Sequence, residues 1–199
     1  VIAHVRHATV GQFSIHNAHP FTTANWSFAH NGTLYGFKLL EPRMLTEVDP
    51  DLRRQRKGET DSELIFLWLM TRMRHLATAQ NGGRPAFWDM MELLAVALRE
   101  LDMRSRATGV GLDSQLNFVL TDGNRLFATC FRNDLFMQRQ NEPHQCDYCG
   151  KDHIQGDAPP DFECVTIVSE PVNDREWEAL PAESVIGVDE NLDLHYWHA

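Results

Sequence analysis

The sequence Thr60-Asp61-Ser62-Glu63 leads directly into the apolar residues Leu64 to Met70. Thr60 and Glu63 stand at the spacing of a capping box, in which the threonine hydroxyl bonds the Glu63 amide and the glutamate side chain reaches back. An unbroken apolar run after such a start predicts a helix that is buried on most sides. We therefore expect a broadly buried helix directly after Thr60.

A second helix is predicted over residues 87–103. Its apolar residues recur at helical spacing, and they are Met90, Leu93, Leu94, Ala97, Leu98 and Leu101. The segment Asn81-Gly82-Gly83-Arg84-Pro85 separates the two helices, because glycine and proline interrupt helical structure.

Strand-like segments lie on both sides of the helices. Residues 1–6 and 26–30 precede them, and residues 116–120 and 125–131 follow, joined by the hairpin signal Thr121-Asp122-Gly123-Asn124. Further strands are expected over 165–169, 185–188 and 194–197. Strands, two helices and strands again favour an α+β domain in which helices cover an antiparallel sheet.

Two polar segments interrupt this plan. Residues 41–58 are rich in charge and contain Pro42 and Pro50, so we expect a long excursion over the surface. Residues 138–160 are interpreted as a polar insertion within a single domain that spans residues 1–199.

Length and composition exclude several classes of protein. The 199 residues contain no apolar run of bilayer length, so one domain and no membrane span are expected. A formal net charge of −10 disfavours nucleic acid as a partner, because phosphate is also negative. The basic stretch Arg53–Lys57 is interpreted as a solvated loop.

The cysteines and the first residue bear on the setting of the protein. Four cysteines are too few for a disulfide scaffold, so we expect a reducing, cytoplasmic environment. Cys130 and Cys164 lie in strand-like segments and are expected to be buried, inert thiols. The chain opens on Val1 without an initiator methionine, and we expect that an N-terminal part is missing.

The residues that could carry chemistry lie in the first third of the chain. The planar guanidinium of Arg6 can donate two parallel hydrogen bonds to a carboxylate. Asn31-Gly32 can present a side-chain amide and a backbone N–H to one oxygen, which is the geometry of an oxyanion hole. Asp61, near a helix N-terminus, stays ionised and could pair with an ammonium. The plainer alternatives are a surface ion pair, a turn and a helix cap, respectively.

Taken in this order, these residues resemble the class II glutamine amidotransferases, which are N-terminal-nucleophile hydrolases that release ammonia from glutamine. The sequence is most similar to the stand-alone branch, which includes γ-glutamyl hydrolases of small-thiol metabolism. The matching stretches are Val1–Gly11, Asn17–Phe21, Trp26–Leu34, Gly58–Leu67, Asn117–Gly123 and Val165–Pro171.

The resemblance implies a four-layer αββα sandwich, incomplete at its N-terminus, in which the two expected helices form one outer layer. It also implies that Arg6 binds the substrate α-carboxylate, with the Thr9 hydroxyl assisting. The Asn31 side-chain amide and the Gly32 backbone N–H would form the oxyanion hole, and Asp61 would hold the α-ammonium. Catalysis in this family requires no cofactor, and the substrate is a small γ-glutamyl molecule.

The nucleophile is the main departure from the family. The family uses a cysteine at the mature N-terminus, upstream of the point that Val1–Arg6 matches, and none of the four cysteines of this chain corresponds to it. A thiolate is needed because hydroxyls lack its nucleophilicity at neutral pH. We expect the parent protein to be active and the 199-residue chain to be inactive. The alternative is a non-catalytic member that binds glutamine-like ligands in the same pocket.

Two groups of residues suggest metal sites. His4, His7, His16, His19 and His30 cluster in the sequence, but their spacing matches no metallohydrolase motif, which favours histidines bonded to the backbone. Cys146 and Cys149 form a Cys-x2-Cys pair flanked by His144 and His153, which could bind a structural zinc ion. The alternative for this segment is an exposed loop with two free thiols.

Overall fold

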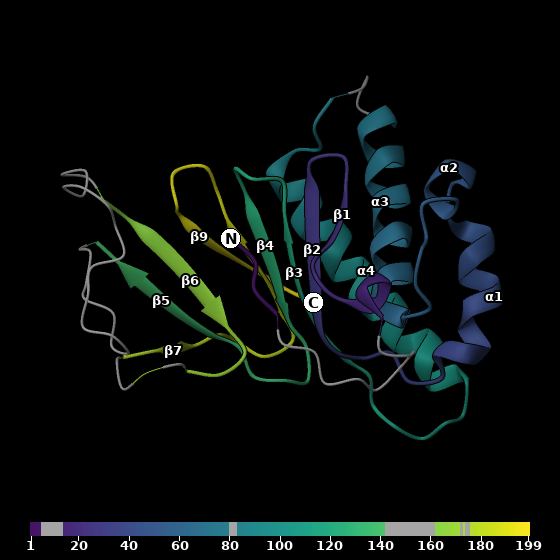
Figure 1. Cartoon of the computed structure of the whole chain (residues 1–199). Coiled ribbons are helices and arrows are strands. Elements are labelled where there is room, and N and C mark those ends of the chain that lie inside the picture. The colour runs from purple at the N-terminus through teal and green to yellow at the C-terminus, as the bar shows by residue number, and fades with distance from the viewer. Residues whose placement is uncertain (5–13, 80–82, 142–161, 172, 174–175) are drawn as a thin grey trace.

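Helices, a six-stranded sheet and a three-stranded sheet form successive layers of the molecule (Figure 1). This computed structural model describes residues 1–4, 14–79, 83–141, 162–171, 173 and 176–199. Both sheets are antiparallel, so the chain is an α+β sandwich. One helical layer and the two sheets of the expected αββα arrangement lie within this described part.

The larger sheet has the strand order β1-β2-β3-β4-β8-β9. Its strands are β1 (Phe21–Thr23), β2 (Trp26–Thr33), β3 (Gln115–Thr121), β4 (Leu126–Cys130), β8 (Ser184–Val188) and β9 (Leu194–His198). The smaller sheet has the order β6-β5-β7. Its strands are β5 (Phe136–Gln140), β6 (Cys164–Val168) and β7 (Glu178–Ala179).

The helices lie together on one face of the larger sheet. They are α1 (Phe37–Glu47), α2 (Pro50–Arg53), α3 (Asp61–Ala79) and α4 (Phe87–Ala107), preceded by the short 3-10 helix η1 (Ile15–Asn17). Helix α3 packs on β2, and α4 packs on β8 and β9. Helices α1 and α2 pack against α3, whose apolar start is therefore enclosed, as its sequence predicts.

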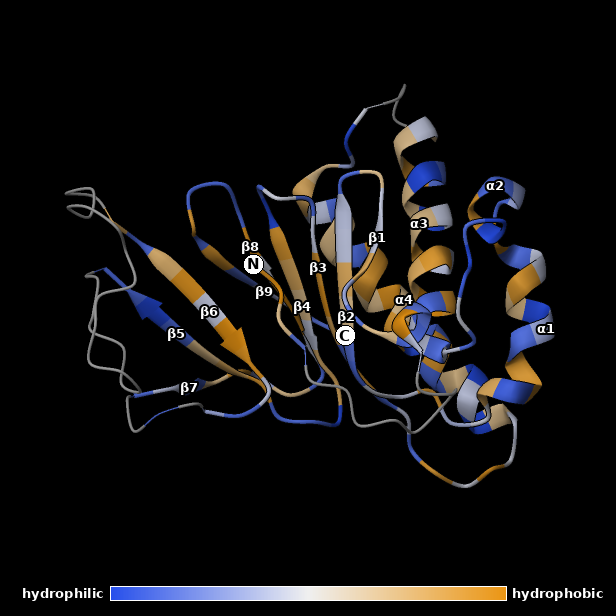
Figure 2. Ribbon diagram, viewed as in Figure 1, coloured by the Kyte–Doolittle hydropathy of each residue, from blue (hydrophilic) through white to orange (hydrophobic). Residues whose placement is uncertain are grey.

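Two hydrophobic cores lie on the two faces of the larger sheet. Phe28, Phe118 and Phe127 belong to the core beneath the helices, which also contains Trp68 of α3. Ala128 and Ile186 belong to a second core with residues of β5 and β6. Successive side chains of a strand point to opposite faces, which lets one sheet serve both cores. Figure 2 shows the hydrophobic residues concentrated along α3 and the central strands.

Most of the predicted elements are confirmed. The helix after Thr60 and the helix from Phe87 correspond to α3 and α4, and α4 extends beyond residue 103 to Ala107. The hairpin across Thr121-Asp122-Gly123-Asn124 joins β3 to β4. The three expected C-terminal strands are β6, β8 and β9.

The expectation of a surface excursion over residues 41–58 is wrong. Helix α1 contains Pro42, and α2 begins with Pro50 at its first position. Proline is tolerated there because the first helical residues need no N–H donor. In α1 the burial of Phe37 and Met44 against the core outweighs the hydrogen bond that Pro42 cannot donate.

Two further expectations need correction. Val1–His4 do not form a strand, because no strand among the described residues pairs with them, and Val5 and Arg6 lie outside that part. Residues 138–140, at the start of the expected insertion, belong to β5, which pairs with β6. Residues 142–160 of that segment lie outside the described residues.

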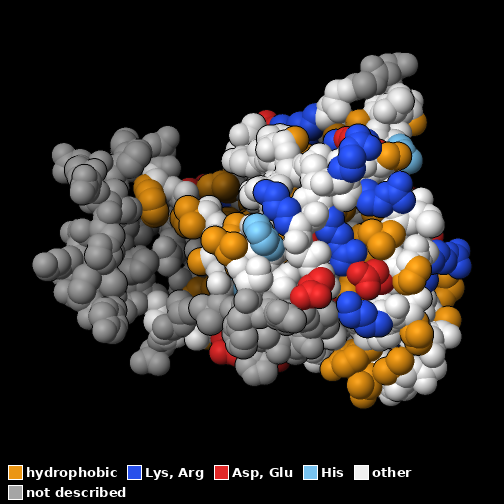
Figure 3. Space-filling model, turned by 45° about the vertical axis from the view of Figure 1, so that its right-hand side comes forward, with side chains coloured by type: hydrophobic (Ala, Val, Ile, Leu, Met, Phe, Trp, Pro, Cys, Tyr) orange, Lys and Arg blue, Asp and Glu red, His pale blue; other side chains and the backbone are white. Residues whose placement is uncertain are grey.

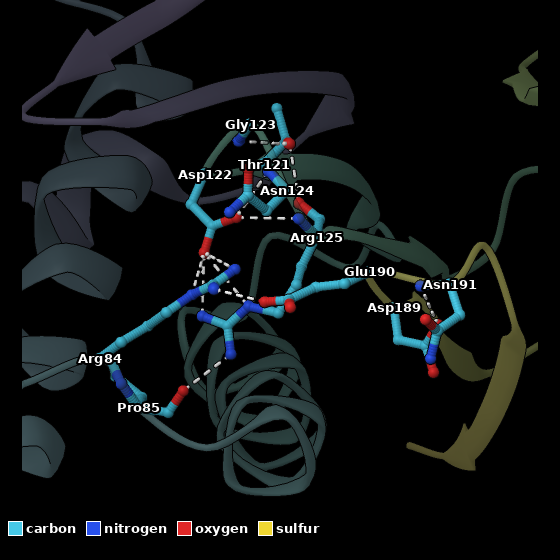
Figure 4. A network of polar contacts seen from close by, with 10 residues as sticks. All are labelled: Arg84, Pro85, Thr121, Asp122, Gly123, Asn124, Arg125, Asp189, Glu190 and Asn191. Carbon is cyan, nitrogen blue, oxygen red and sulfur yellow. Dashed lines mark hydrogen bonds and ion pairs between the residues drawn. The ribbon is translucent and has the colours of Figure 1, made fainter.

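A polar network around the buried carboxylate of Asp122 closes the β3–β4 hairpin (Figure 4). The Asp122 carboxylate accepts hydrogen bonds from Arg125 Nη2 at 2.9 Å and from Arg84 Nε at 2.8 Å. Arg84 also pairs with Glu190, in the loop between β8 and β9, at 2.6 Å. Burial alone would raise the pKa of Asp122, but hydrogen bonds from Arg125 and from backbone amides hold that pKa below its ordinary value.

Replacing Asp122 by asparagine should lower the free energy of unfolding at pH 7 by about 2 kcal/mol, since charge-assisted hydrogen bonds are lost. A carboxylate with a depressed pKa stabilises the fold above the unfolded-state pKa of about 3.9 and loses this effect as pH falls through the folded-state value. The difference between wild type and Asp122→Asn should therefore shrink below about pH 4. Urea denaturation at several pH values measures it, and a constant difference would contradict the assignment.

Charges of both signs are mixed on the helical side of the molecule. In Figure 3, Lys and Arg side chains lie among acidic and uncharged ones. Arg74, for example, pairs with Asp51 at 2.7 Å, and Arg56 pairs with Glu41 at 2.7 Å. Of the helices described, none is both long enough and apolar enough to cross a bilayer.

Candidate active site

The end of β2 meets the beginning of α3 at one end of the larger sheet (Figure 1). Asp61 is the first residue of α3 and is only 4% exposed. Its Oδ2 accepts a hydrogen bond from the Leu34 backbone N–H at 2.8 Å, and its Oδ1 accepts one from the Ser62 N–H at 2.9 Å. Asp61 therefore holds the start of α3 against the segment that follows Asn31-Gly32.

A buried histidine makes a second connection between β2 and α3. His30 Nδ1 lies 3.0 Å from Ser62 Oγ, and His30 Nε2 lies 3.0 Å from the carbonyl oxygen of Gln115 on β3. The ring also contacts Phe118 edge-on, with 5.1 Å between centroids. Burial lowers the pKa of His30, while the nearby Asp61 carboxylate and the Gln115 carbonyl act in the opposite direction.

Asn31 points away from the helices. His30 faces α3, and alternation along a strand places the next side chain on the opposite face, the one that carries the smaller sheet. Asn31 is exposed on that face. Its backbone carbonyl accepts a long hydrogen bond of 3.5 Å from Asn133 Nδ2, in the turn that follows β4. The side-chain amide is thus presented at the surface of β2.

Gly32 occupies a position that no other residue can take without strain. Its φ is +154°, and a Cβ built on it would lie 2.0 Å from the carbonyl oxygen of Gln115. The absence of a side chain therefore allows β2 and β3 to approach at this point.

The backbone N–H of Gly32 points away from β3. Its partner across the ladder, Leu116, donates its own N–H to the Phe131 carbonyl at 3.1 Å and accepts at its carbonyl from Thr129 Oγ1 at 2.6 Å. Both backbone groups of Leu116 thus face β4. Opposed residues in an antiparallel ladder exchange either two backbone hydrogen bonds or none, so Leu116 and Gly32 exchange none and the Gly32 N–H faces away from β3. Since β1 pairs with β2 only as far as Phe28, the Gly32 N–H lies beyond the end of β1.

The loop before α3 is tied to the same region. The Glu63 carboxylate accepts from the backbone N–H groups of Lys57 at 2.8 Å and Gly58 at 2.7 Å. Asn17 Oδ1 accepts from the Glu59 N–H at 3.0 Å. The structure therefore brings together three of the sequence clusters, those around Asn17, around Asn31 and around Asp61.

The predicted capping box is half confirmed. Thr60 Oγ1 accepts from the Glu63 N–H at 3.2 Å, as expected. The Glu63 side chain bonds the amides of Lys57 and Gly58 instead of reaching back to Thr60. Its carboxylate therefore shapes the loop that leads into the helix.

Several residues that support this region are not predicted from the sequence. Ser62 bonds His30, and Asn117 lies directly opposite Asn31 in the β2–β3 ladder. Asn117 is buried, accepts from the Phe131 N–H at 2.7 Å and donates to the Asn133 carbonyl at 3.1 Å. The sequence signal for Asn117 is a polar residue among apolar ones in a strand, because a buried polar side chain requires hydrogen-bond partners.

Several predicted site residues lie outside the described residues. Arg6 and Thr9 do so, as does the Cys-x2-Cys segment with its two flanking histidines, residues 144–153. Within the part of the chain that is described, no three His, Cys, Asp or Glu residues are arranged to hold a metal ion. The rings of His4 and His19 contact each other, with 4.1 Å between centroids.

The two described cysteines lie on β4 and β6. Cys130, on β4, is 2% exposed, and its Sγ donates to the Asn133 carbonyl at 3.4 Å. Burial raises the pKa of this thiol. Cys164, on β6, is half-buried, so the expectation of full burial is wrong for it. Strand β6 lies at an edge of the smaller sheet, where β5 is its one neighbouring strand among the described residues.

Comparison with known proteins identifies the family. The family model for class II glutamine amidotransferases matches residues 1–188. The chain belongs to the class II glutamine amidotransferases. The match includes the β2 strand with Asn31-Gly32 and the start of α3 with Asp61.

Two curated relatives of this amidotransferase chain carry corresponding names. The "Putative glutamine amidotransferase YafJ" of Escherichia coli is 34% identical over 137 residues, which are 67% of this chain and 46% of that protein. The "Probable glutamine amidotransferase DUG3" of Saccharomyces cerevisiae is 25% identical over 98% of this chain and 58% of its own length. The chain thus spans about half the length of these relatives.

Solved structures show the same fold. A glutamine aminotransferase class-II domain protein from Silicibacter pomeroyi matches with a TM-score of 0.63 and 20% identity, over 90% of this chain and 70% of that one. A "predicted glutamine amidotransferase" from Pseudomonas aeruginosa matches with a TM-score of 0.64 and 24% identity, over 90% of this chain and 65% of that one. The amidotransferase domain therefore has the fold of these neighbours.

Proposed function

We propose that the full-length protein hydrolyses the γ-glutamyl amide of glutamine or of a small γ-glutamyl compound. The observation that carries this proposal is the hydrogen bond from the Leu34 N–H to Asp61 at 2.8 Å. It joins a buried carboxylate to the residues that directly follow Asn31-Gly32. The group proposed to bind the ammonium and the groups proposed to bind the oxyanion therefore lie on two segments that this hydrogen bond joins.

Asp61 is proposed to bind the substrate α-ammonium. Its carboxylate is buried, and no Lys, Arg or His among the described residues forms a salt bridge with it. Each of its oxygens can accept more than the single backbone hydrogen bond that it receives. A buried carboxylate is costly without a cation, so a substrate ammonium would supply the missing charge.

Asn31 and Gly32 are proposed to stabilise the oxyanion. The Asn31 side-chain amide is exposed, and the Gly32 N–H points beyond the end of β1. Two preorganised donors aimed at one oxygen stabilise the charge that develops on it during attack. Arg6, with the Thr9 hydroxyl, is proposed to bind the α-carboxylate, which would complete the recognition of a free amino acid.

The nucleophile is proposed to be a cysteine thiolate outside the 199 residues. Cys130 is unsuited to this role, because it is buried and its pKa is raised. The sulfur would attack the γ-carbonyl carbon, and the proton lost by the thiol would be transferred to the amide nitrogen, so that the C–N bond breaks and ammonia leaves. Water would then hydrolyse the γ-glutamyl thioester, giving glutamate and the free thiol. This route needs no metal or organic cofactor.

Ammonia release from L-glutamine tests the proposed reaction. The full-length protein should release ammonia, and the 199-residue chain should not, because the attacking thiolate lies outside it. A full-length protein that binds L-glutamate yet releases no ammonia from glutamine or from γ-glutamyl amides would favour the alternative, a non-catalytic binding protein. Turnover by the 199-residue chain would refute the assignment of the nucleophile.

Replacing Asp61 by asparagine should weaken substrate binding. The amide retains the size of the carboxylate and an oxygen for the Leu34 N–H, but it loses the negative charge that would attract the α-ammonium. We expect KM for glutamine to rise about tenfold or more, since charge-assisted hydrogen bonds contribute roughly 1.5–3 kcal/mol. Steady-state kinetics at pH 7.5 measure this. Asp51→Asn, at an exposed position on α2, is the control.

A further inference from the structure

One hydroxyl proton is shared between two acceptors beside the candidate site. Ser62 Oγ lies 3.0 Å from His30 Nδ1 and 3.3 Å from Asp61 Oδ1. A hydroxyl has a single proton, so Ser62 can donate to the imidazole or to the carboxylate, but not to both. The choice depends on the protonation state of His30.

The Gln115 carbonyl fixes how the imidazole is protonated. A carbonyl oxygen only accepts, so His30 Nε2 must carry a proton in order to bond it at 3.0 Å. In neutral imidazole Nδ1 is then a bare acceptor, and the Ser62 hydroxyl donates to it. In the imidazolium, Nδ1 donates to Ser62 Oγ instead, and the hydroxyl proton turns to Asp61 Oδ1.

The two protonation states of His30 leave Asp61 with different abilities to bind a cation. With neutral His30, Oδ1 accepts only the Ser62 N–H at 2.9 Å and can still take an ammonium. With charged His30, the hydroxyl occupies a lone pair of Oδ1, and a positive charge already lies beside the carboxylate. Both changes weaken the attraction of Asp61 for a second cation.

We propose that His30 and Ser62 are positioning residues that make binding of the substrate ammonium to Asp61 competitive with protonation of His30. The proposal rests on the function assigned to Asp61 above. The buried carboxylate is neutralised by one cation at a time, either the imidazolium of His30 or the α-ammonium of a γ-glutamyl ligand.

The surroundings of the ring support this coupling. Asp61 on α3 is the charged group that acts on His30, whereas β3 contributes the Gln115 carbonyl and the Phe118 ring. Burial lowers the pKa of His30, so the neutral state, which leaves Asp61 available, prevails at neutral pH. By linkage, ligand binding must in turn disfavour protonation of His30.

Inhibition of the full-length protein by L-glutamate tests the proposal without turnover of the probe. The inhibition constant should rise as pH falls below the pKa of His30, with a limiting slope of about tenfold per pH unit for one linked proton. Glutarate, which lacks the α-ammonium, should show no such rise over pH 5–8. A glutarate curve that parallels the glutamate curve would overturn the proposal.

Three variants identify the residues responsible. His30→Gln should flatten the L-glutamate curve, because it removes the titrating group. Ser62→Ala should reduce the total rise of the inhibition constant, because it removes the relay but leaves the charge of the imidazolium beside Asp61. His75→Gln, at an exposed position of the same helix, should retain the wild-type curve. If His30→Gln fails to fold, Ser62→Ala alone decides the matter. An unchanged pH dependence in Ser62→Ala would contradict the proposal.

The same assay separates this proposal from the proposed function. If Asp61→Asn leaves L-glutamate inhibition at pH 7.5 unchanged, Asp61 is not the ammonium ligand and the proposed function is wrong at that residue. If Asp61→Asn weakens inhibition but the pH dependence persists unchanged in both His30→Gln and Ser62→Ala, only the competition with His30 is refuted.

Discussion

Asn31→Ala in the full-length protein should reduce kcat for glutamine hydrolysis by about 10²–10³-fold, with a much smaller change in KM. The amide donates to an oxygen that is fully charged only in the transition state, so its removal affects the chemical step more than ground-state binding. The fold should survive, because the Asn31 side chain is exposed and the bond from Asn133 reaches its backbone carbonyl. Steady-state kinetics of ammonia release measure the effect.

A matched control for Asn31→Ala is Asn191→Ala, in the exposed turn between β8 and β9. Its side chain lies in the loop region drawn in Figure 4, which is remote in the sheet from β2. Kinetic parameters should be those of the wild type. Equal losses of kcat in the two variants, or a pure KM effect in Asn31→Ala, would contradict the role of Asn31 in binding the oxyanion.

Gly32→Ala should affect both stability and activity. The new Cβ would lie 2.0 Å from the Gln115 carbonyl oxygen, in a backbone conformation with φ of +154° that disfavours any L side chain. Backbone strain and overpacking together should lower the free energy of unfolding by about 3 kcal/mol or more. Displacement of β2 from β3 would also move the Gly32 N–H, so ammonia release should fall even where the protein remains folded.

Gly123→Ala separates the two causes. Gly123 also has a positive φ, of +94°, but a Cβ added there meets no atom within 4 Å. It should cost only the strain of about 1–3 kcal/mol and leave ammonia release unchanged at temperatures where the protein is folded. Denaturation curves and kinetics of both variants provide the comparison. If both substitutions lowered the free energy of unfolding equally, the close contact with Gln115 would not be the cause of the destabilisation by Gly32→Ala.

The elements with strong periodicity could be predicted from the sequence. Helix α3 follows from its cap at Thr60 and the apolar run after it, and the β3–β4 hairpin follows from its turn residues. Helix α1 could not be predicted in this way, because Pro42 and its charged neighbours are typical of a loop. Its formation depends on burial of Phe37 and Met44 against α3, which is a tertiary effect.

The connections of the candidate site could not be predicted from the sequence. Asn31-Gly32 and Asp61 are proposed from their residue types as oxyanion and ammonium groups, and the bond from Leu34 to Asp61 ties the start of α3 to the segment that follows Asn31-Gly32. The role of Ser62 was not visible, since a serine inside a capping sequence carries no signal of its own. It depends on the register that places His30 beside α3.

The most direct measurement is a crystal structure of the full-length protein with L-glutamate bound. We expect one γ-carboxylate oxygen to lie about 2.7–3.1 Å from both Asn31 Nδ2 and the Gly32 nitrogen, at the distance of a preorganised donor pair. We also expect a direct hydrogen bond between the α-ammonium and the Asp61 carboxylate. A glutamate bound in the reverse orientation, or at a site that touches neither Asn31 nor Asp61, would contradict the roles proposed for these residues.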